Sequence, residues 1–259
     1  MNERLRQQLF DPFAMALAVV GVTVALIVAM GESLLALFQP GDTKDRLDRP
    51  ELWYALVLSL SVIGVAGFLV PPFFYFRNSA EALGAYYGEV AKATDREVMV
   101  YDNPNATKTP MSVDVLARLA EDNPNINHIK VTDTDIAKVS ALAERTDAVL
   151  LAGSDEVMHH QVLRGCAGAV TAAPHVFPRV ARAWFDAAGD EAEGRRHYDR
   201  MTPFIIELLQ GSDQYPAAVK LALHHLGVLP DAAVLPPLTP LDARRRQGIA
   251  VVLDGHDLD

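Results

Sequence analysis

The runs VMVYD at residues 98–102 and INHIKV at residues 126–131 decide the fold of this chain. Each run is short and apolar on both faces, which is typical of a strand in a parallel sheet covered by helices. Three similar runs complete the series: GFLV at 67–70, AVLLAG at 148–153 and GAVTAA at 168–173. The starts of successive runs lie roughly 20 to 30 residues apart, too far for hairpins and right for strand–helix–strand crossovers. The pattern therefore predicts an α/β fold built on a parallel sheet.

Amphipathic segments separate these strands, and polar residues mark where the helices begin. Ser79 and Ser112 are the expected N-caps, because they precede AEALGAYYGEVAKA and VDVLARLAED. After Pro174 the pattern is helical, over VFPRVARAWFDAA, EAEGRRHYDRMTPFIIELLQ and AAVKLALHHLG. The proline-rich residues 230–240 predict an extended segment, and a short helix is expected around residues 242–253.

The first 66 residues differ from the rest in composition. Residues 13–30 and 52–76 carry no charged side chain, and each approaches the ~20 apolar residues that cross a bilayer. The sequence therefore favours a hydrophobic N-terminal domain, residues 1–66, of two transmembrane helices, the second of which could extend to residue 76. A second domain follows over residues 67–259.

Charges around the apolar stretches indicate an orientation. Arg4 and Arg6 precede the first stretch and Arg77 follows the second, so the positive-inside rule places both ends in the cytoplasm. The chain is then associated with the membrane, with its larger domain on the cytoplasmic side. The alternative is a cytoplasmic protein in which both stretches belong to a buried core.

Composition excludes several classes of partner. The formal net charge is −10 and the basic residues form no long run, so no nucleic-acid surface is indicated. The single cysteine, Cys166, lies in an apolar run and is expected to be a buried small side chain. The adjacent histidine pairs at 159–160 and 224–225 point to different helix faces and make poor metal ligands. We expect neither a metal nor another cofactor.

Two polar residues occupy positions that suggest chemistry. Tyr101 lies near the end of VMVYD and Lys130 near the end of INHIKV, and functional residues of parallel α/β sheets gather at these strand ends. An ammonium is costly to bury unless it is paired, and desolvation favours the neutral amine, which attacks carbonyl carbons. A tyrosine hydroxyl beside it is suited to proton transfer. The residues alone also allow simpler interpretations, in which Lys130 extends to water or pairs with Asp133.

The ordered motifs extend well beyond this pair. VPPFFYFRNSAEAL, VMVYDNP, INHIKVTD, LLAGSD, GAVTA, YPAAVKLAL and LPPLTPL resemble the dihydrodipicolinate synthase and N-acetylneuraminate lyase family over about 190 residues. The resemblance implies part of a (β/α)₈ TIM barrel, namely strands four to eight and the C-terminal helices. It also implies a Schiff-base-forming carbon–carbon lyase, an aldolase, whose small-molecule partners are pyruvate or a related 2-oxo acid and an aldehyde.

The resemblance assigns roles to individual residues. Lys130 is implied to be the amine that forms the Schiff base, and Tyr101 of the Tyr-Asp-Asn-Pro motif is implied to be the proton relay. The residues implied to bind substrate are Tyr75, Gly153, Asp155 and Val170.

Two departures from the family pattern bear on activity. Ala106 stands where dihydrodipicolinate synthases carry an arginine, and the local sequence is closer to 2-keto-3-deoxy-sugar-acid aldolases. The first three β/α units are not recognisable, and their nearest match, Ala29-Met30-Gly31-Glu32-Ser33, lacks the expected threonines. Five strands leave two exposed sheet edges, so another copy of the chain in a homo-oligomer is one way to complete the barrel. The alternative function is that of a catalytically inactive barrel remnant fused to a membrane segment, a non-enzymatic membrane protein.

Overall fold

The computed structural model describes residues 67–74, 78–211 and 214–255. Five strands form one sheet in the order β1-β2-β3-β4-β5, and every neighbouring pair is parallel. The strands are β1 (Phe68–Val70), β2 (Val98–Asp102), β3 (His128–Val131), β4 (Val149–Ala152) and β5 (Gly168–Ala169). Each of the five predicted runs therefore contains a strand, although the last is reduced to Gly168–Ala169, and the predicted parallel α/β fold is confirmed.

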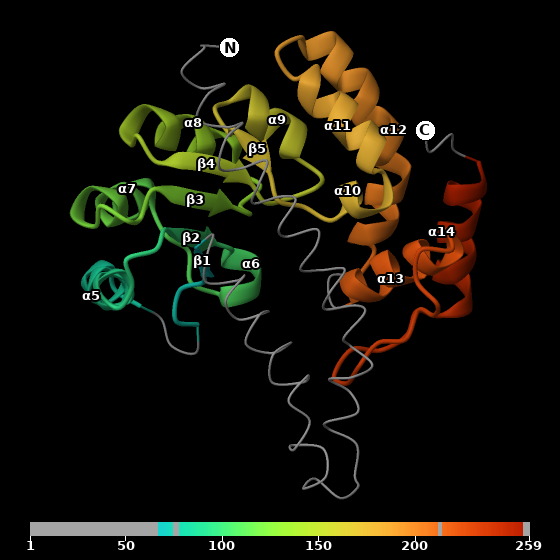
Figure 1. Cartoon of the computed structure of the whole chain (residues 1–259), viewed down its shortest axis with the longest axis horizontal. Helices are drawn as coiled ribbons and strands as arrows, with labels where there is room; N and C mark the ends of the chain where they lie inside the picture. Colours follow the sequence, from blue (N-terminus) through green and yellow to red (C-terminus); the bar gives the residue numbers. More distant parts are fainter. Residues whose placement is uncertain (1–66, 75–77, 212–213, 256–259) are drawn as a thin grey trace, which may run out of the picture.

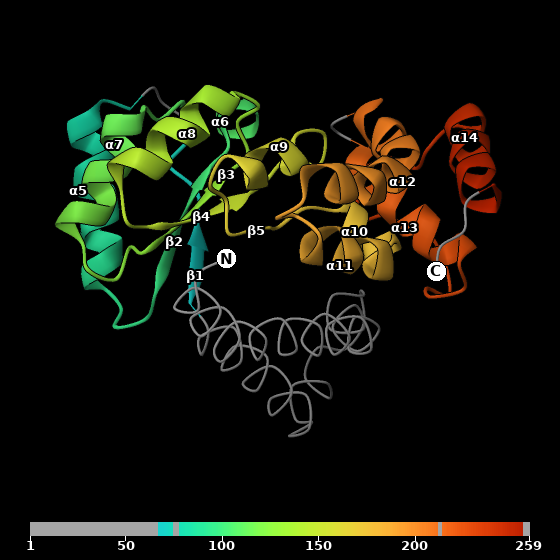
Figure 2. The same cartoon turned by 90° about the horizontal axis from the view of Figure 1, so that it is seen from above.

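Helices between successive strands cover one face of this sheet (Figures 1 and 2). They are α5 (Ala80–Lys92), α7 (Val113–Asp122), α8 (Ile136–Arg145) and α9 (Met158–Leu163), with the single turn α6 (Pro104–Thr107) after β2. Ser79 accepts a hydrogen bond from the Ala82 amide and Ser112 accepts one from the Val115 amide. Both predicted N-caps are confirmed.

Alternation along the strands separates the two faces of the sheet. Val98 and Val100 of β2, with Ile129 and Val131 of β3, belong to the buried core that includes side chains of α5, α7 and α8. Because successive side chains point to opposite faces, Tyr101 points away from that helical layer. Lys130, its partner on β3, lies on the same face.

A second group of helices lies beyond the carboxyl ends of the strands (Figure 1). It contains α10 (Ala173–Val176), α11 (Pro178–Asp186), α12 (Glu191–Leu209), α13 (Tyr215–His225) and α14 (Ala243–Asp254). The helices predicted after Pro174 are confirmed, although α13 begins at Tyr215 instead of Ala217. Residues 230–240 contain no helix, as predicted.

The structure bears on only part of the membrane prediction. Residues 13–30, and 52–66 of the second apolar stretch, lie outside the described residues. Phe68–Val70 form a strand that pairs with β2. The prediction that the second transmembrane helix could extend through them to residue 76 is therefore wrong. Within the described part of the chain, no helix combines the length and apolar character that a membrane span requires.

Cys166 offers a direct test of the core. Its side chain is buried, and this burial raises the pKa of the thiol from 9.0 to about 12. Because the thiolate is the reactive form, we expect no reaction with Ellman's reagent in the native chain at about pH 8. One equivalent should react after unfolding, since the chain has one cysteine. Rapid labelling of the native chain would contradict the described packing.

Candidate functional site

Tyr101 and Lys130 lie side by side on neighbouring strands. They are register partners in the pairing of β2 with β3, and Nζ of Lys130 lies 4.3 Å from the centroid of the Tyr101 ring. Lys130 is 8% exposed. A tyrosine ring attracts a cation, although less strongly than a carboxylate does at close range. The lysine is thus largely withdrawn from water beside a polarisable hydroxyl-bearing ring.

The predicted alternative partner of Lys130 is engaged elsewhere. Oδ2 of Asp133 lies 3.0 Å from Nζ of Lys138 in α8, so the interpretation in which Asp133 neutralises Lys130 is wrong. Among the described residues no carboxylate forms an ion pair with Lys130. No carboxylate in the described part of the chain therefore holds the Lys130 side chain in an ion pair.

Asn103 fixes the tyrosine hydroxyl. Nδ2 of Asn103 donates to Oη of Tyr101 at 3.0 Å, while its Oδ1 accepts from the Ala106 amide and caps α6. Because Asn103 donates to Tyr101, the tyrosine O–H remains able to donate to a third group. The Tyr-Asp-Asn-Pro motif therefore orients the predicted relay as well as ending its strand.

Gly153 makes room for the lysine. A Cβ on Gly153 would overlap Oγ1 of Thr132, the nearest atom, and would lie 3.0 Å from both Cε of Lys130 and the Val131 carbonyl oxygen. The Lys130 side chain therefore passes directly over the backbone that follows β4. Glycine is required here by this close approach, which gives Gly153 a definite place in the site.

Thr132 is a site residue that the sequence analysis missed. Its buried Oγ1 has no hydrogen-bond partner among the described residues, and it lies on the same side of Gly153 as the lysine. The signal was the two-residue period of the strand, which places Thr132 on the face of Lys130. A hydroxyl without a partner at this position is available to a bound molecule.

Of two further predicted site residues, Val170 is described by the structure and Tyr75 is not. Val170 follows β5, its amide donates to the Ala152 carbonyl at 2.8 Å, and it is 40% exposed. It therefore lies directly after β5, beside the end of β4, which Gly153 follows. Tyr75 lies outside the described residues.

Asp155 has a different environment from the one expected of a substrate ligand. Its carboxylate, 1% exposed, accepts hydrogen bonds from the Ala172 and Ala173 amides and from the Tyr215 hydroxyl. The Tyr198 hydroxyl donates to its backbone carbonyl, and burial raises the pKa of Tyr198 to about 12. All these contacts join the end of β4 to helices α10, α12 and α13.

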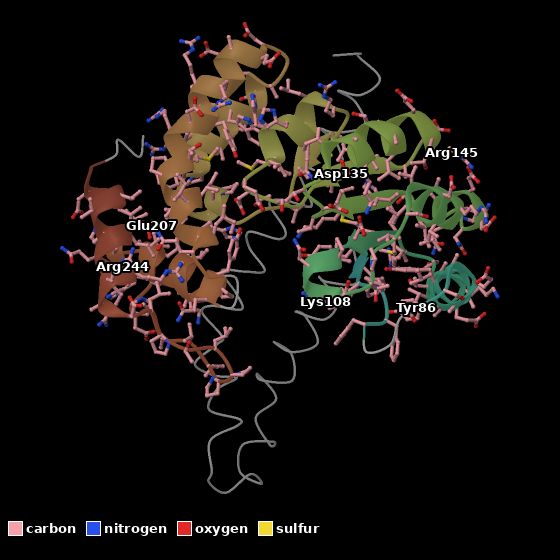
Figure 3. The ribbon with its side chains drawn as sticks, turned by 180° about the vertical axis from the view of Figure 1, so that it is seen from behind. Tyr86, Lys108, Asp135, Arg145, Glu207 and Arg244 are labelled. Atoms are coloured by element: carbon pink, nitrogen blue, oxygen red, sulfur yellow. The ribbon has the colours of Figure 1, made fainter. Side chains whose placement is uncertain are left out.

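Figure 3 shows which side of the α/β part faces the C-terminal helices α10 to α14. Lys108, after α6, and Asp135, before α8, lie on the side of the α/β part that faces Glu207 and Arg244, whereas Tyr86 and Arg145 lie on the far side. A hollow of about 250 Å³ near Arg145 is lined by residues at the amino ends of β3 and β4. It lies at the end of the sheet opposite Lys130, so its position does not match the candidate site.

Comparison with known proteins gives one consistent result. The model of the dihydrodipicolinate synthetase family matches residues 56–255. The 4-hydroxy-tetrahydrodipicolinate synthase of Phenylobacterium zucineum is 30% identical over 203 residues, covering 77% of this chain and 68% of the relative. The 4-hydroxy-tetrahydrodipicolinate synthase 1 of Streptomyces coelicolor is 32% identical over 196 residues, covering 75% and 64%.

A solved structure shows the same arrangement. The chloride-inhibited dihydrodipicolinate synthase of Acinetobacter baumannii, complexed with pyruvate, superposes with a TM-score of 0.70 at 25% identity. The match covers 78% of this chain and 69% of that one. This chain thus spans about two thirds of the length of the proteins it resembles.

The Asp155 contacts predict a stability effect. Replacing Tyr215 by phenylalanine removes one hydrogen bond to a buried carboxylate, so we expect the free energy of unfolding to fall by about 1.5–3 kcal/mol in urea denaturation. Tyr86→Phe is the matched control, because its hydroxyl donates to the carbonyl of Pro71 at an exposed position, and it should cost less than about 0.5 kcal/mol. Equal losses in the two variants would show that Asp155 does not anchor the helical group.

Proposed function

This chain belongs to the dihydrodipicolinate synthetase family, and on that premise we propose that it is a lyase whose Lys130 forms a Schiff base with pyruvate or a related 2-oxo acid. The observation that carries the proposal is the placement of Lys130, which is largely buried, beside Tyr101 and without a carboxylate partner among the described residues. A lysine in a structural salt bridge would not present a free amine.

The first step follows from this placement. The neutral Lys130 amine attacks the ketone carbon of the 2-oxo acid, a C–N bond forms and the carbonyl oxygen takes up a proton. Loss of that oxygen as water gives the protonated imine. The imine then draws electrons from the neighbouring carbon, which loses a proton to give an enamine. That carbon forms a bond to the aldehyde carbon while the aldehyde oxygen takes up a proton, and cleavage is the reverse of this step.

Tyr101 is the proposed proton carrier for these steps. Each stage moves a proton between nitrogen, oxygen and carbon, and the hydroxyl of Tyr101 is held by Asn103 on the edge where Lys130 ends. A positioned acid or base accelerates such a transfer by about 10²–10⁴-fold. Tyr101 is therefore assigned the relay and Asn103 its orientation.

The remaining assignments concern substrate binding. Gly153 leaves room for the Lys130 side chain. Val170, partly exposed beyond β5, is proposed to border the 2-oxo acid. Asp155 is proposed to support the substrate site without touching the substrate, because its carboxylate accepts hydrogen bonds from α10 and α13. The proposed contribution of Tyr75 rests on the family resemblance alone. The Thr132 hydroxyl, which has no partner among the described residues, is proposed to bind the substrate beside Lys130.

The aldehyde partner is proposed from the sequence. Ala106 stands where a dihydrodipicolinate synthase is expected to carry an arginine. Without that arginine, a carboxylate of the aldehyde partner cannot be bound at this position, so an aldehyde without such a carboxylate is favoured. A 2-keto-3-deoxy-sugar acid is the proposed class of product or substrate. The relatives named above are synthases, and they lend no support to the alternative of an inactive remnant. Attachment to a membrane through residues 1–66 stays a prediction.

Trapping of the imine tests the function directly. With pyruvate and borohydride, we expect the intact mass of the full chain to rise by one reduced adduct, and the adduct to map to Lys130. Lys130→Ala should not be labelled, whereas Lys220→Ala, at an exposed helix position, should be labelled as the native chain is. An unlabelled native chain, under conditions that label an active family member, would refute the proposal.

Tyr101→Phe separates proton transfer from packing. The phenylalanine ring keeps the contact with the lysine but has no hydroxyl, so we expect the rate of labelling to fall by about 10²–10⁴-fold while the final extent is reached slowly. Asn103→Ala, which frees the hydroxyl, should give a smaller decrease. A Tyr101→Phe variant that labels at the native rate would remove Tyr101 from the mechanism.

A further inference from the structure

A charged cluster lies behind the site, at the boundary between the sheet and its helices. Asp102 ends β2, and its fully buried Oδ2 lies 2.6 Å from Nζ of Lys138 in α8. The same ammonium lies 3.0 Å from Oδ2 of Asp133, two residues beyond β3. The Lys138 side chain is 9% exposed. These three residues are called the ionic clamp below.

The clamp joins the two strand ends that carry the site. Asp102 is the register partner of Val131, one position beyond the pair of Tyr101 with Lys130. The Thr132 amide donates to the Asp102 carbonyl at 2.8 Å, which extends the same pairing. Lys138 therefore links the residue directly after Tyr101 to the turn that follows Lys130.

A second helix holds the same turn. Nε2 of the fully buried Gln161 in α9 donates to the carbonyls of Val131 and Asp133 at 3.1 Å and 2.9 Å. The Gly153 amide also donates to the Val131 carbonyl at 2.8 Å. The backbone on both sides of Thr132 is thus held by α9 and by the end of β4, while Thr132 and Lys130 face the site.

We propose that Lys138 is a positioning residue, which through Asp102 and Asp133 sets the separation of Tyr101 and Lys130 that imine formation requires. The inference rests on the Schiff-base function proposed above. Lys138 itself does not touch the reacting atoms, because it approaches the strand ends from α8, on the other face of the sheet.

Energetics favour positioning over simple stabilisation. Withdrawing charges from water costs several kcal/mol per ion, and apolar side chains of similar volume often stabilise a fold equally well. Burial raises the pKa of Asp102, and Lys138 opposes that shift. The charged form of Asp102 therefore depends on Lys138, and the attraction is strong only while the strand ends stay close. The pair of Asp102 with Lys138 therefore fixes the distance between the two strand ends, on which the contact of Tyr101 with Lys130 depends.

The test measures the rate of pyruvate trapping in the full chain at temperatures below each variant's melting point. In Lys138→Met we expect the rate at saturating pyruvate to fall about tenfold to hundredfold, as for a reacting pair displaced by about an ångström. The pyruvate concentration for half-maximal rate should change little, because the clamp does not contact pyruvate. Lys138→Arg keeps the charge and should recover most of the rate.

Two further variants separate geometry from stability. Asp102→Asn combined with Lys138→Gln removes both charges together, so that no unpaired ion is left buried, and this variant should be as slow as Lys138→Met. Val139→Ala loosens the buried packing of the same helix without touching the clamp. It should melt at a lower temperature and still label at the native rate.

The outcomes distinguish the two proposals. Native-rate labelling in both Lys138→Met and the double variant, with labelling of the native chain intact, overturns the positioning role and leaves the Schiff-base function standing. An equal decrease in Val139→Ala also overturns it, because loss of stability alone would then explain the effect. A native chain that never labels overturns both proposals.

Discussion

The parallel pairing of β2 with β3 is the constraint on which the rest of the site depends. It places Tyr101 opposite Lys130, and the two-residue alternation of a strand then directs both side chains to one face. The same alternation sends Asp102 and Val131 to the other face, where helices cover them. One register therefore places the candidate site on one face of the sheet and its supporting residues on the other.

The site is continuous with the helical group through the end of β4. Gly153, which has no side chain, lets Lys130 pass close to its backbone. Two residues later, the Asp155 carboxylate accepts hydrogen bonds from the start of α10 and from Tyr215 of α13. A short loop thus shapes the lysine's path and also fixes the orientation of the C-terminal helices. A change in this loop is expected to affect packing and chemistry together.

The described sheet has exposed apolar residues at both of its edges. Phe68, Leu69 and Val170 are exposed large apolar residues on the first strand and beyond the last, at edges that a closed barrel would not have. The chain spans about two thirds of the length of its relatives. Completion of the barrel by a second copy of the chain remains a proposal. It is suggested by the exposed apolar residues at both edges, because a second copy would bury them.

The sequence alone determined the five strands, the helices after Ser79 and Ser112 and the helical C-terminal part, because strand runs, N-caps and proline positions are local features. It also indicated Lys130 and Tyr101, since a lysine in an apolar strand is conspicuous without any knowledge of its surroundings. Only the tertiary structure decided which groups are partners. Asp133 is three residues from Lys130 in sequence and pairs with Lys138, and Asp155 serves α10 and α13. Thr132 became part of the site for the same reason. Spacing along a strand gives the face that a side chain occupies, but ion pairs and hydrogen bonds also depend on what other strands and helices bring to that face, and spacing along the chain does not encode this.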